Sequence, residues 1–460
     1  MAKEQPCHRR GCSLFKHSCF LYENFILSIR QAIIFEVGSH FTMGRKGIRV
    51  RLRPRVDAFH AFLAGRFFSR VGDKIFLVAL PLLIQGMGSG AALLSFANAL
   101  QYVANWAGGP LGGYLTERHS RKAVMLAVHA AQAAAILGVI ASLSIRSLFP
   151  FILVFSIFLL HLASMVNRVN RFSLTTLLRD RDQIPQANAE IQLMESAARL
   201  VGPWVAGIVI VHLRLRAALG LDLLSFLIMA MVVWVALPLP AGERQGAHSS
   251  AARGRDLWRW RFEGPDGVGR VLLVNGLVNV AFTFVSGFNV FLMSSTHHLS
   301  VMVISWILTA TAGASLLLGI ILRANLAHVA EPSLAKMGLG LALSGVGMAG
   351  LPFAHHAELY LVAYAACILG MEWYQAQVQT WLQMRLAKSE LNRAFVATSH
   401  VQNAVTPLWM VSGGFLWRAQ GPWLPLSLCA ACALGGGLAV WFLGRVSETR
   451  PPIQDDSGTA

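Results

Sequence analysis

The sequence alternates long apolar runs with short interruptions of charged and turn-forming residues, from about residue 60 to about residue 445. An α-helix needs about 20 mainly apolar residues to cross a bilayer, and most of the runs reach that length. The pattern therefore predicts an all-α integral membrane protein with twelve transmembrane helices. We expect them at residues 60–84, 92–115, 121–142, 148–172, 190–212, 217–238, 270–293, 300–322, 336–354, 358–381, 394–417 and 422–444.

The longest polar interruption, at residues 239–269, divides the predicted helices into two groups of six. It predicts an N-terminal six-helix bundle at 43–238, a cytoplasmic linker, a C-terminal six-helix bundle at 270–444 and a cytoplasmic tail at 445–460. Matches at equivalent loops indicate that the two halves are pseudo-repeats. Two repeats of the same topology place a substrate site between them, near the middle of the membrane.

Residues 1–42 differ from the rest, because they are cysteine-rich and their hydrophobic pieces are interrupted by charges before they reach a spanning length. They also lack the apolar core and cleavage site of a signal peptide. Six basic residues follow Met43 within twelve positions, which is typical of the cytoplasmic approach to a first membrane helix. We expect Met43 to be the true start, with the preceding extension either a translated upstream region or a dispensable tail.

Charged residues make up only 13% of the chain against 55% hydrophobic residues, which leaves too little polar surface for a soluble globule. The net charge of +17 would otherwise suggest a nucleic-acid partner. Of the 39 Lys and Arg residues, 26 fall on one side of the predicted membrane and four on the other. This bias predicts that both termini are cytoplasmic, and it accounts for the net charge without nucleic acid.

The sequence contains no Walker, H-E-x-x-H or G-x-S-x-G motif, so we expect neither an enzyme nor a directly ATP-driven pump. The six cysteines imply no disulfide framework, and those near the N-terminus fit no zinc spacing. We therefore expect no metal site and no cofactor.

Three acids, Asp73, Glu195 and Glu372, are predicted to lie well inside membrane helices, where a charge is costly. Each is a candidate for proton coupling. Arg70 precedes Asp73 by three positions and Arg199 follows Glu195 by four, spacings at which helical side chains can pair. A structural ion pair is therefore the alternative to proton uptake at Asp73 and Glu195.

Polar and aromatic side chains within the predicted helices are candidates for lining a substrate cavity. Arg199 could bind an anionic substrate or pair with an acid of the first helix. Glu372 stands among aromatic and amide residues, which suit a bulky polar-aromatic solute. Interhelical hydrogen bonds and interfacial tryptophan belts are the alternatives. The candidates are Arg199, Asn98, Gln101, Asn105, Trp106, Gln132, Trp373, Tyr374 and Gln377.

The turn after the second predicted helix reads GYLTERHSRK at residues 113–122. It resembles the signature loop of the major facilitator superfamily, with Glu117 in place of the usual Asp and a serine in place of a usual glycine. We expect Gly113 to permit close helix approach. In that family the loop contacts the start of the eleventh helix and helps to hold the outward-facing state. The resemblance implies that Gly113, Glu117, Arg118 and Arg121 are gate residues; the alternative is that the basic residues only fix topology.

Residues 198–207 read ARLVGPWVAG, which is similar to the antiporter motif of superfamily exporters with alanine at two glycine positions. Pro203 removes a backbone donor, so with Gly202 it makes either a functional hinge or a kinked packing surface. Residues 72–81, GDKIFLVALP, resemble a pattern near the start of many drug-efflux members. The chain looks most like the branch that includes enterobactin-type siderophore exporters and macrolide-efflux proteins.

This resemblance implies the major facilitator fold in a monomeric, multi-pass protein of the bacterial inner membrane, with the proton gradient as its energy source. It implies proton-coupled efflux of a small amphipathic molecule, a siderophore or a drug, by alternating access. An importer of a small organic solute is the nearest alternative. A membrane sensor or scaffold that has kept the fold without transport is another.

Overall fold

Nearly all the described backbone is α-helical, as a chain in hydrocarbon requires to satisfy its backbone hydrogen bonds. The computed structural model describes residues 58–85, 90–145, 147–178, 183–237, 268–324, 333–386 and 388–448. All of these belong to one compact unit, Val56–Ala460. The predicted N-terminal extension, most of the linker and the end of the tail lie outside the described residues.

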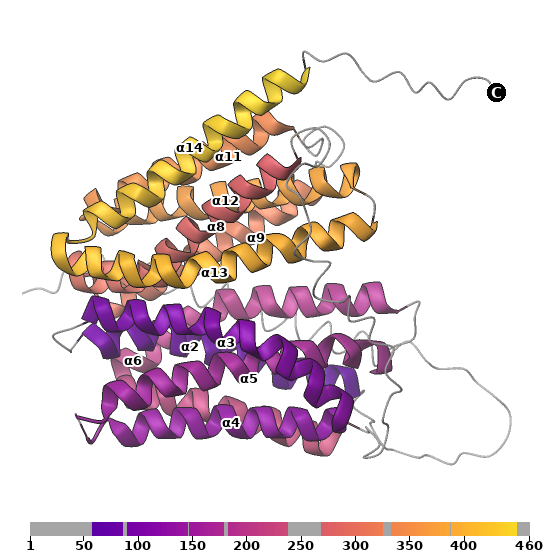
Figure 1. The fold of residues 1–460 in the computed structure, drawn as a ribbon. Helices are drawn as coiled ribbons and strands as arrows, with labels where there is room; N and C mark the ends of the chain where they lie inside the picture. The colour runs from indigo at the N-terminus through magenta and orange to yellow at the C-terminus, as the bar shows by residue number, and fades with distance from the viewer. Residues whose placement is uncertain are drawn as a thin grey trace, which may run out of the picture. The chain divides into compact units, whose positions relative to one another are not determined.

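The helices before the linker form what we call the first helix set, coloured from indigo to pink in Figure 1. The set contains α2 (Ala58–Gln85), α3 (Gly90–Arg118), α4 (Arg121–Ser142), α5 (Phe149–Leu178) and α6 (Ile184–Ala236). α6 covers two of the predicted helices, because its backbone leaves helical geometry only at Arg214, where φ is 69° and ψ is 167°. The turn predicted there is a single-residue break rather than a loop.

The helices after the linker form the second helix set. The set contains α8 (Val268–Phe291) with the π-helix η2 (Leu292–Thr296), α9 (Val301–Ala324), α11 (Leu334–Gly350) with the 3₁₀ turn η3 (Leu351–Phe353), α12 (Ala357–Arg385), α13 (Lys388–Gln420) and α14 (Trp423–Glu448). The all-α membrane fold predicted from the sequence is confirmed, although several helices run farther than predicted. α3 continues to Arg118 and α13 begins at Lys388, because an apolar run marks the hydrocarbon-spanning part of a helix and not its polar ends.

Seven of the described helical segments are long and apolar enough to cross a membrane by length and composition. They are Arg121–Ser142, Phe149–Asn170, Glu190–Ala236, Val268–Thr296, Val301–Ile321, Leu334–Phe353 and Trp423–Arg445. α2, α3, α12 and α13 are not among them. α2, α3 and α12 carry most of the polar and charged candidate residues, and α13 contains other polar and charged residues, which lowers the mean hydropathy of these four helices.

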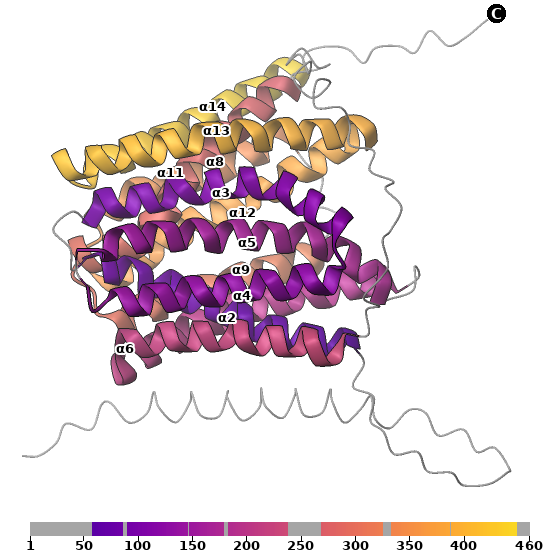
Figure 2. The same ribbon diagram turned by 60° about the horizontal axis from the view of Figure 1, so that its bottom comes forward.

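The two helix sets pack against each other through α3 with α13 and α6 with α9 (Figures 1 and 2). Small residues allow these contacts. Gly414 of α13 faces Ser95 of α3, and Gly207 of α6 faces Ser305 of α9. A Cβ at either glycine would collide with the opposing serine, so close approach of the sets requires glycine at both positions.

Candidate functional site

A cavity of about 310 Å³ lies between the two helix sets. Side chains from α2 and α3 form one wall, and side chains from α8, α9 and α12 form the other. The lining combines aliphatic and aromatic groups with amides and hydroxyls, a mixture typical of sites for small organic molecules. The lining residues are Leu77, Leu80, Pro81, Leu94, Asn98, Gln101, Tyr102, Phe282, Thr283, Ser286, Gly287, Asn289, Val290, Leu308 and Tyr364.

Amide side chains form hydrogen bonds around this cavity, and one amide N–H donor has no partner among the described residues. Asn98 of α3 donates through Nδ2 to the carbonyl oxygen of Gly287 on α8, at 3.2 Å. Tyr360 of α12 donates to Oδ1 of Asn289, at 2.6 Å. The Nδ2 of Asn289 is buried without a hydrogen-bond partner within the described part of the chain. A ligand oxygen in the cavity could accept from it, since an unsatisfied buried amide is costly.

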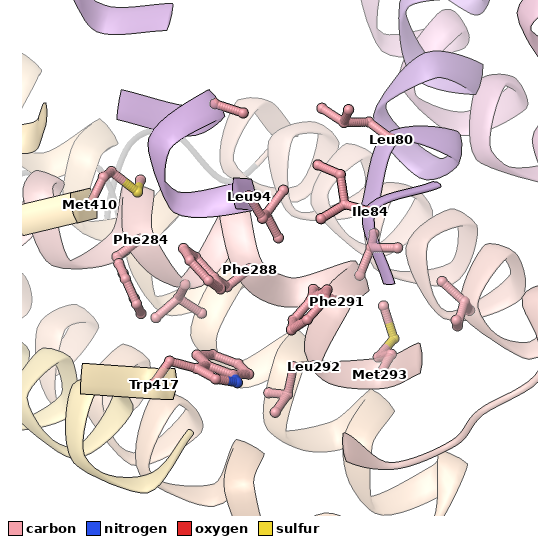
Figure 3. Close-up of a cluster of buried hydrophobic side chains, with 14 of the residues drawn as sticks. Leu80, Ile84, Leu94, Phe284, Phe288, Phe291, Leu292, Met293, Met410 and Trp417 are labelled. Carbon is pink, nitrogen blue, oxygen red and sulfur yellow. The ribbon is translucent and has the colours of Figure 1, made fainter. Parts of the chain in front are cut away.

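The cavity is closed at the end of the molecule where α2 ends and α3 begins, which we call the α2–α3 end. Figure 3 shows side chains from α2, α3, α8, η2 and α13 converging there. Phe288 stacks on Phe284 and on Trp417, with ring centroids 4.5 Å and 5.0 Å apart. We call this cluster the apolar plug; it comprises Leu80, Ile84, Leu94, Phe284, Phe288, Phe291, Leu292, Met293, Met410 and Trp417.

Polar contacts at the α2–α3 end reinforce the plug. Gln85 at the end of α2 donates to the carbonyl oxygen of Ser294 in η2, at 3.1 Å. His297, just after η2 and outside the apolar span, contacts the carbonyl oxygen of Leu351 through Nε2, at 3.0 Å. Burial lowers the pKa of His297 below its ordinary value of 6.5, with smaller contributions in the same direction from His355 and His298.

Charged side chains form an ion-pair network between α2 and α6. Nη1 of Arg70 donates to Oδ2 of Asp73 at 3.0 Å. Arg66 donates to Oε1 of Glu195, and Nη2 of Arg70 lies 3.7 Å from the same oxygen. Arg66 is only 6% exposed. Glu195 therefore connects two arginines of α2 to α6.

The pairing of Arg70 with Asp73 confirms the spacing argument, whereas the predicted pairing of Glu195 with Arg199 differs from the structure. Glu195 pairs with Arg66 and Arg70, and Nη2 of Arg199 donates to Oγ of Ser196 at 2.9 Å. The spacing of four identified a possible partner on the same helix. Arg66 on α2 stands 129 positions away in the sequence, and spacing along one helix gives no information about a partner on another helix.

A second, smaller cavity of about 50 Å³ adjoins this network inside the first helix set. Its walls include Arg70, Asp73 and Arg168 together with His129 and Gln132. Gln132, predicted to line a substrate cavity, belongs here and donates to Oγ of Ser164 at 3.1 Å. The space is large enough for water, which needs at least about 10–15 Å³ and polar partners.

The antiporter motif is a packing surface in this structure. A Cβ at Gly202 would collide with the side chain of Lys74 on α2, so this glycine lets a cationic side chain of α2 lie against α6. Gly207 of the same motif faces Ser305 of the second helix set. α6 stays helical through Pro203. The hinge role of Gly202 and Pro203 stays a prediction.

The signature loop lies at the opposite end, where α3 turns into α4. Arg118 stacks over the ring of Tyr114 at 4.5 Å, and Lys122 donates to the carbonyl oxygens of Trp234 and Leu237 at the end of α6. The backbone carbonyl of Arg121 accepts from Asn170 of α5. The side chains of Glu117 and of the first residues of α13 lie outside the described residues, so the predicted gate contact stays a prediction.

The expected close helix approach at Gly113 is wrong. A Cβ there would meet no atom of the described structure within 4 Å, whereas a Cβ at Gly112 would lie 3.1 Å from Cα of Val166 on α5. α3 therefore presents Gly112, and not Gly113, to its neighbour. A rotation of one residue, about 100° around a helix, separates the two positions.

The remaining candidates are dispersed. Asn98 and Gln101 line the cavity between the sets, but Trp106 is exposed, and Asn105 is half-buried on the same helix. Trp373 donates to the carbonyl oxygen of Lys336 on α11, whereas Tyr374 and Gln377 are buried within the second helix set. Glu372 is exposed, two turns beyond the cavity-lining Tyr364 on the same helix.

Two buried charged groups, Arg66 and Asp222, were not among the candidates drawn from the sequence. Arg66 stands inside the predicted helix 60–84, where a buried charge is costly. Asp222 is 1% exposed and lies in α6 opposite Gly72. Its position five residues inside the predicted helix 217–238 was the signal that could have revealed it.

A family model of the Major Facilitator Superfamily matches residues 62–291. The chain belongs to the major facilitator superfamily. Macrolide efflux protein A of Streptococcus pyogenes is 25% identical over 370 residues, which cover 77% of this chain and 87% of that protein. Membership makes the chain a multi-pass membrane transporter of small molecules, and the resemblance to the macrolide-efflux branch is confirmed.

Solved structures of major facilitator transporters share the fold. A point mutant of the nucleoside transporter NupG matches with a TM-score of 0.66 at 11% identity, over 84% of this chain and 99% of that one. A bacterial homologue of the iron transporter ferroportin, in an inward-facing state, matches with a TM-score of 0.64 at 16% identity, over 85% and 99% of the two chains. An auto-inhibited POT family peptide transporter gives 0.63 at 15% identity, over 88% and 99%.

Proposed function

We propose that the protein is a proton-coupled exporter that moves a small amphipathic molecule out of the cytoplasm by alternating access. The observation that carries the proposal is a cavity between the two helix sets that the apolar plug closes at one end. Its mixed amide, hydroxyl and apolar lining suits an amphipathic solute. In this proposal all twelve predicted helices span the bacterial inner membrane, and the protein works as a monomer.

The bias of Lys and Arg in the sequence supports an orientation with both termini in the cytoplasm. The α2–α3 end is then extracellular, and the plug closes the cavity to the outside. Opening that end requires α8 and α13 to separate from α2 and α3 at the plug. Rocking of the two helix sets about the cavity would expose it to each side in turn.

The macrolide efflux relative supports an antibiotic as cargo. The cavity volume of about 310 Å³ falls at the lower end of the range for small-molecule pockets, about 300–1,000 Å³. A macrolide therefore requires the cavity to widen toward the cytoplasm. A siderophore is the alternative cargo that the sequence suggests.

Proton coupling is assigned to the acids of the helices, Asp73, Glu195 and Glu372. Asp73 and Glu195 are each held by arginines on α2. Protonation of Glu195 would weaken the contact between α2 and α6 directly. Protonation of Asp73 would release Arg70, which also lies 3.7 Å from Glu195. The proton gradient then takes the place of a cofactor.

Everted membrane vesicles test this function. Vesicles that contain the protein should accumulate radiolabelled erythromycin when respiration energises them, and a protonophore should collapse the accumulation. Vesicles from cells without the protein supply the background, including passive distribution of this weak base. Enterobactin in place of erythromycin tests the siderophore.

The alternatives give different outcomes. If intact cells with the protein accumulate either probe above the background, the protein is an importer. If neither probe is transported in either direction, but cells that lack the protein still differ from cells that have it, the chain acts as a sensor or scaffold. Accumulation that needs ATP but resists the protonophore would contradict proton coupling.

A further inference from the structure

Asp222 is a carboxyl group buried in the middle of the first helix set. It lies eight positions after the break at Arg214 and is 1% exposed. Its Oδ1 atom has no hydrogen-bond partner among the described residues. An ionised carboxylate in such a place would be uncompensated, and burial of an unpaired charge is strongly destabilising.

The surroundings of Asp222 come from α2. A Cβ at Gly72 would lie 2.6 Å from Oδ1 of Asp222, so the carboxyl touches the α2 backbone where only glycine fits. Ser225 also faces Gly72, and its hydroxyl hydrogen is donated to the backbone carbonyl of Asp222, at 2.7 Å. The serine hydroxyl also lies within hydrogen-bond reach of the carboxyl, so it can accept from the protonated form or, after rotation, donate to the ionised form, but as a neutral group it cannot balance a charge.

The charged groups on the neighbouring helices do not supply a cation for Asp222. On α2 Asp73, directly after Gly72, acts on it with the same charge sign. Of the two cations beside Asp73, Arg70 pairs with Asp73 itself and the Lys74 side chain lies against Gly202. On α4 His129 stacks on Phe226, one turn along α6 from Asp222. α9 carries no charged residue before Arg323. α5 contributes His161 and also Arg168, which lines the same small cavity as Asp73.

We propose that Asp222 is a proton-binding residue of the transport cycle, protonated in this conformation and exchanging its proton with Asp73. The inference rests on the proposed function. In the exchange, the O–H bond at Asp222 breaks and an O–H bond forms at the Asp73 carboxylate. Asp222 becomes the anion, and Arg70 loses the charge of its partner.

Asp73 gives this proton a polar route onward. It lines the small cavity of the first helix set, beside Arg70 and His129, which has room for water. Asp73 is also accessible, since its side chain is 30% exposed. Asp222 would thus hold the proton away from water, and Asp73 would pass it between Asp222 and the aqueous cavity.

The test compares purified wild-type protein with Asp222→Asn and with Glu190→Gln, which removes a carboxyl near the start of α6 outside the proposed machinery. Infrared spectra at neutral pH should show the carbonyl band of a protonated carboxylic acid in wild-type protein and in Glu190→Gln. The band should be lost in Asp222→Asn. Absence of the band in wild-type protein would overturn the proposal without any variant.

Transport supplies the second measurement. In proteoliposomes Asp222→Asn should still exchange labelled for unlabelled erythromycin, because this exchange moves no net proton. Its proton-driven accumulation of erythromycin should fall to the level of protein-free liposomes. If it keeps proton-driven accumulation equal to that of Glu190→Gln, the inference fails and the proposed function stands. If wild-type protein itself shows no proton-driven accumulation, the proposed function fails, and this role of Asp222 fails with it.

Discussion

The contact between α2 and α6 in the first helix set carries formal charges, whereas the contact between α8 and α12 in the second set is made by neutral amides. Glu195 of α6 pairs with Arg66 of α2, while Gln375 of α12 donates to Oδ1 of Asn275 and of Asn279 on α8, at 3.3 and 2.9 Å. A proton can change the first kind of contact but leaves amides unaffected at physiological pH. We propose that the first of these contacts responds to protons, while the second holds its two helices together at any physiological pH.

Removal of Glu195 should have the largest effect on stability, because it removes the charged contact between α2 and α6. Glu195→Ala leaves Arg66 buried without its carboxylate, and loss of one partner of a buried pair costs about 3–5 kcal/mol. We expect a large fall in the apparent Tm of the detergent-solubilised protein and in the yield of monodisperse protein. Glu195→Gln, which keeps the shape and one acceptor, should fall less. Equal Tm values for wild type and Glu195→Ala would show that the ion pair of Glu195 with Arg66 does not stabilise the fold.

The apolar plug, which joins side chains of both helix sets, should give the next largest effect. Phe288 is 1% exposed, and Phe288→Ala should cost about 3 kcal/mol of packing at the α2–α3 end. A cysteine introduced at Leu94, which is buried in the plug, should then react faster with an impermeant maleimide added from outside. Phe415→Ala, at an exposed position of α13, is the control and should leave the reaction rate unchanged. An unchanged rate in Phe288→Ala would rule out the plug as the external closure.

The amide network of the second set should give a smaller effect than the ion pairs of the first. Gln375→Ala removes two interhelical hydrogen bonds, and such bonds in membrane proteins contribute about 0.6 kcal/mol each on average. The fall in apparent Tm should therefore be clearly below that of Glu195→Ala. A larger fall in Gln375→Ala would reverse the comparison.

The smallest expected effect concerns pH at the α2–α3 end. Burial lowers the pKa of His297, so the released side chain takes up a proton at a higher pH than the packed one. The contribution of His297 to stability is full above its ordinary pKa of 6.5 and is lost as pH falls through the lowered value. Between about pH 8 and about pH 5 the apparent Tm of wild-type protein should therefore fall more than that of His297→Gln. Parallel Tm curves for the two proteins would contradict this.

The helices could be predicted from the sequence because most of the apolar runs are long enough to cross hydrocarbon and turn-forming or charged residues separate them. The pairing of Arg70 with Asp73 was also predictable, since three positions along a helix bring two side chains together. The partner of Glu195, the closed plug and the contact of Gly72 with Asp222 were not predictable. They depend on how α2, α6, α8 and α13 rotate about their axes, and apolar periodicity is weak in helices that are hydrophobic all round. Trp373 and Tyr374 illustrate this. They are adjacent in the sequence, but successive residues of a helix point in different directions, so the two side chains contact different neighbours.

The proposal that a charged contact in the first helix set couples protons to transport can be tested through erythromycin-driven proton movement. Proteoliposomes that contain a trapped pH dye are prepared with wild-type protein and with Asp73→Asn in the same lipids. Passive movement of the weak base is the same in both. We expect efflux of erythromycin to drive protons in the opposite direction with wild-type protein only. Equal proton movement in the two preparations, with erythromycin transported by both, would contradict the role of this contact in coupling.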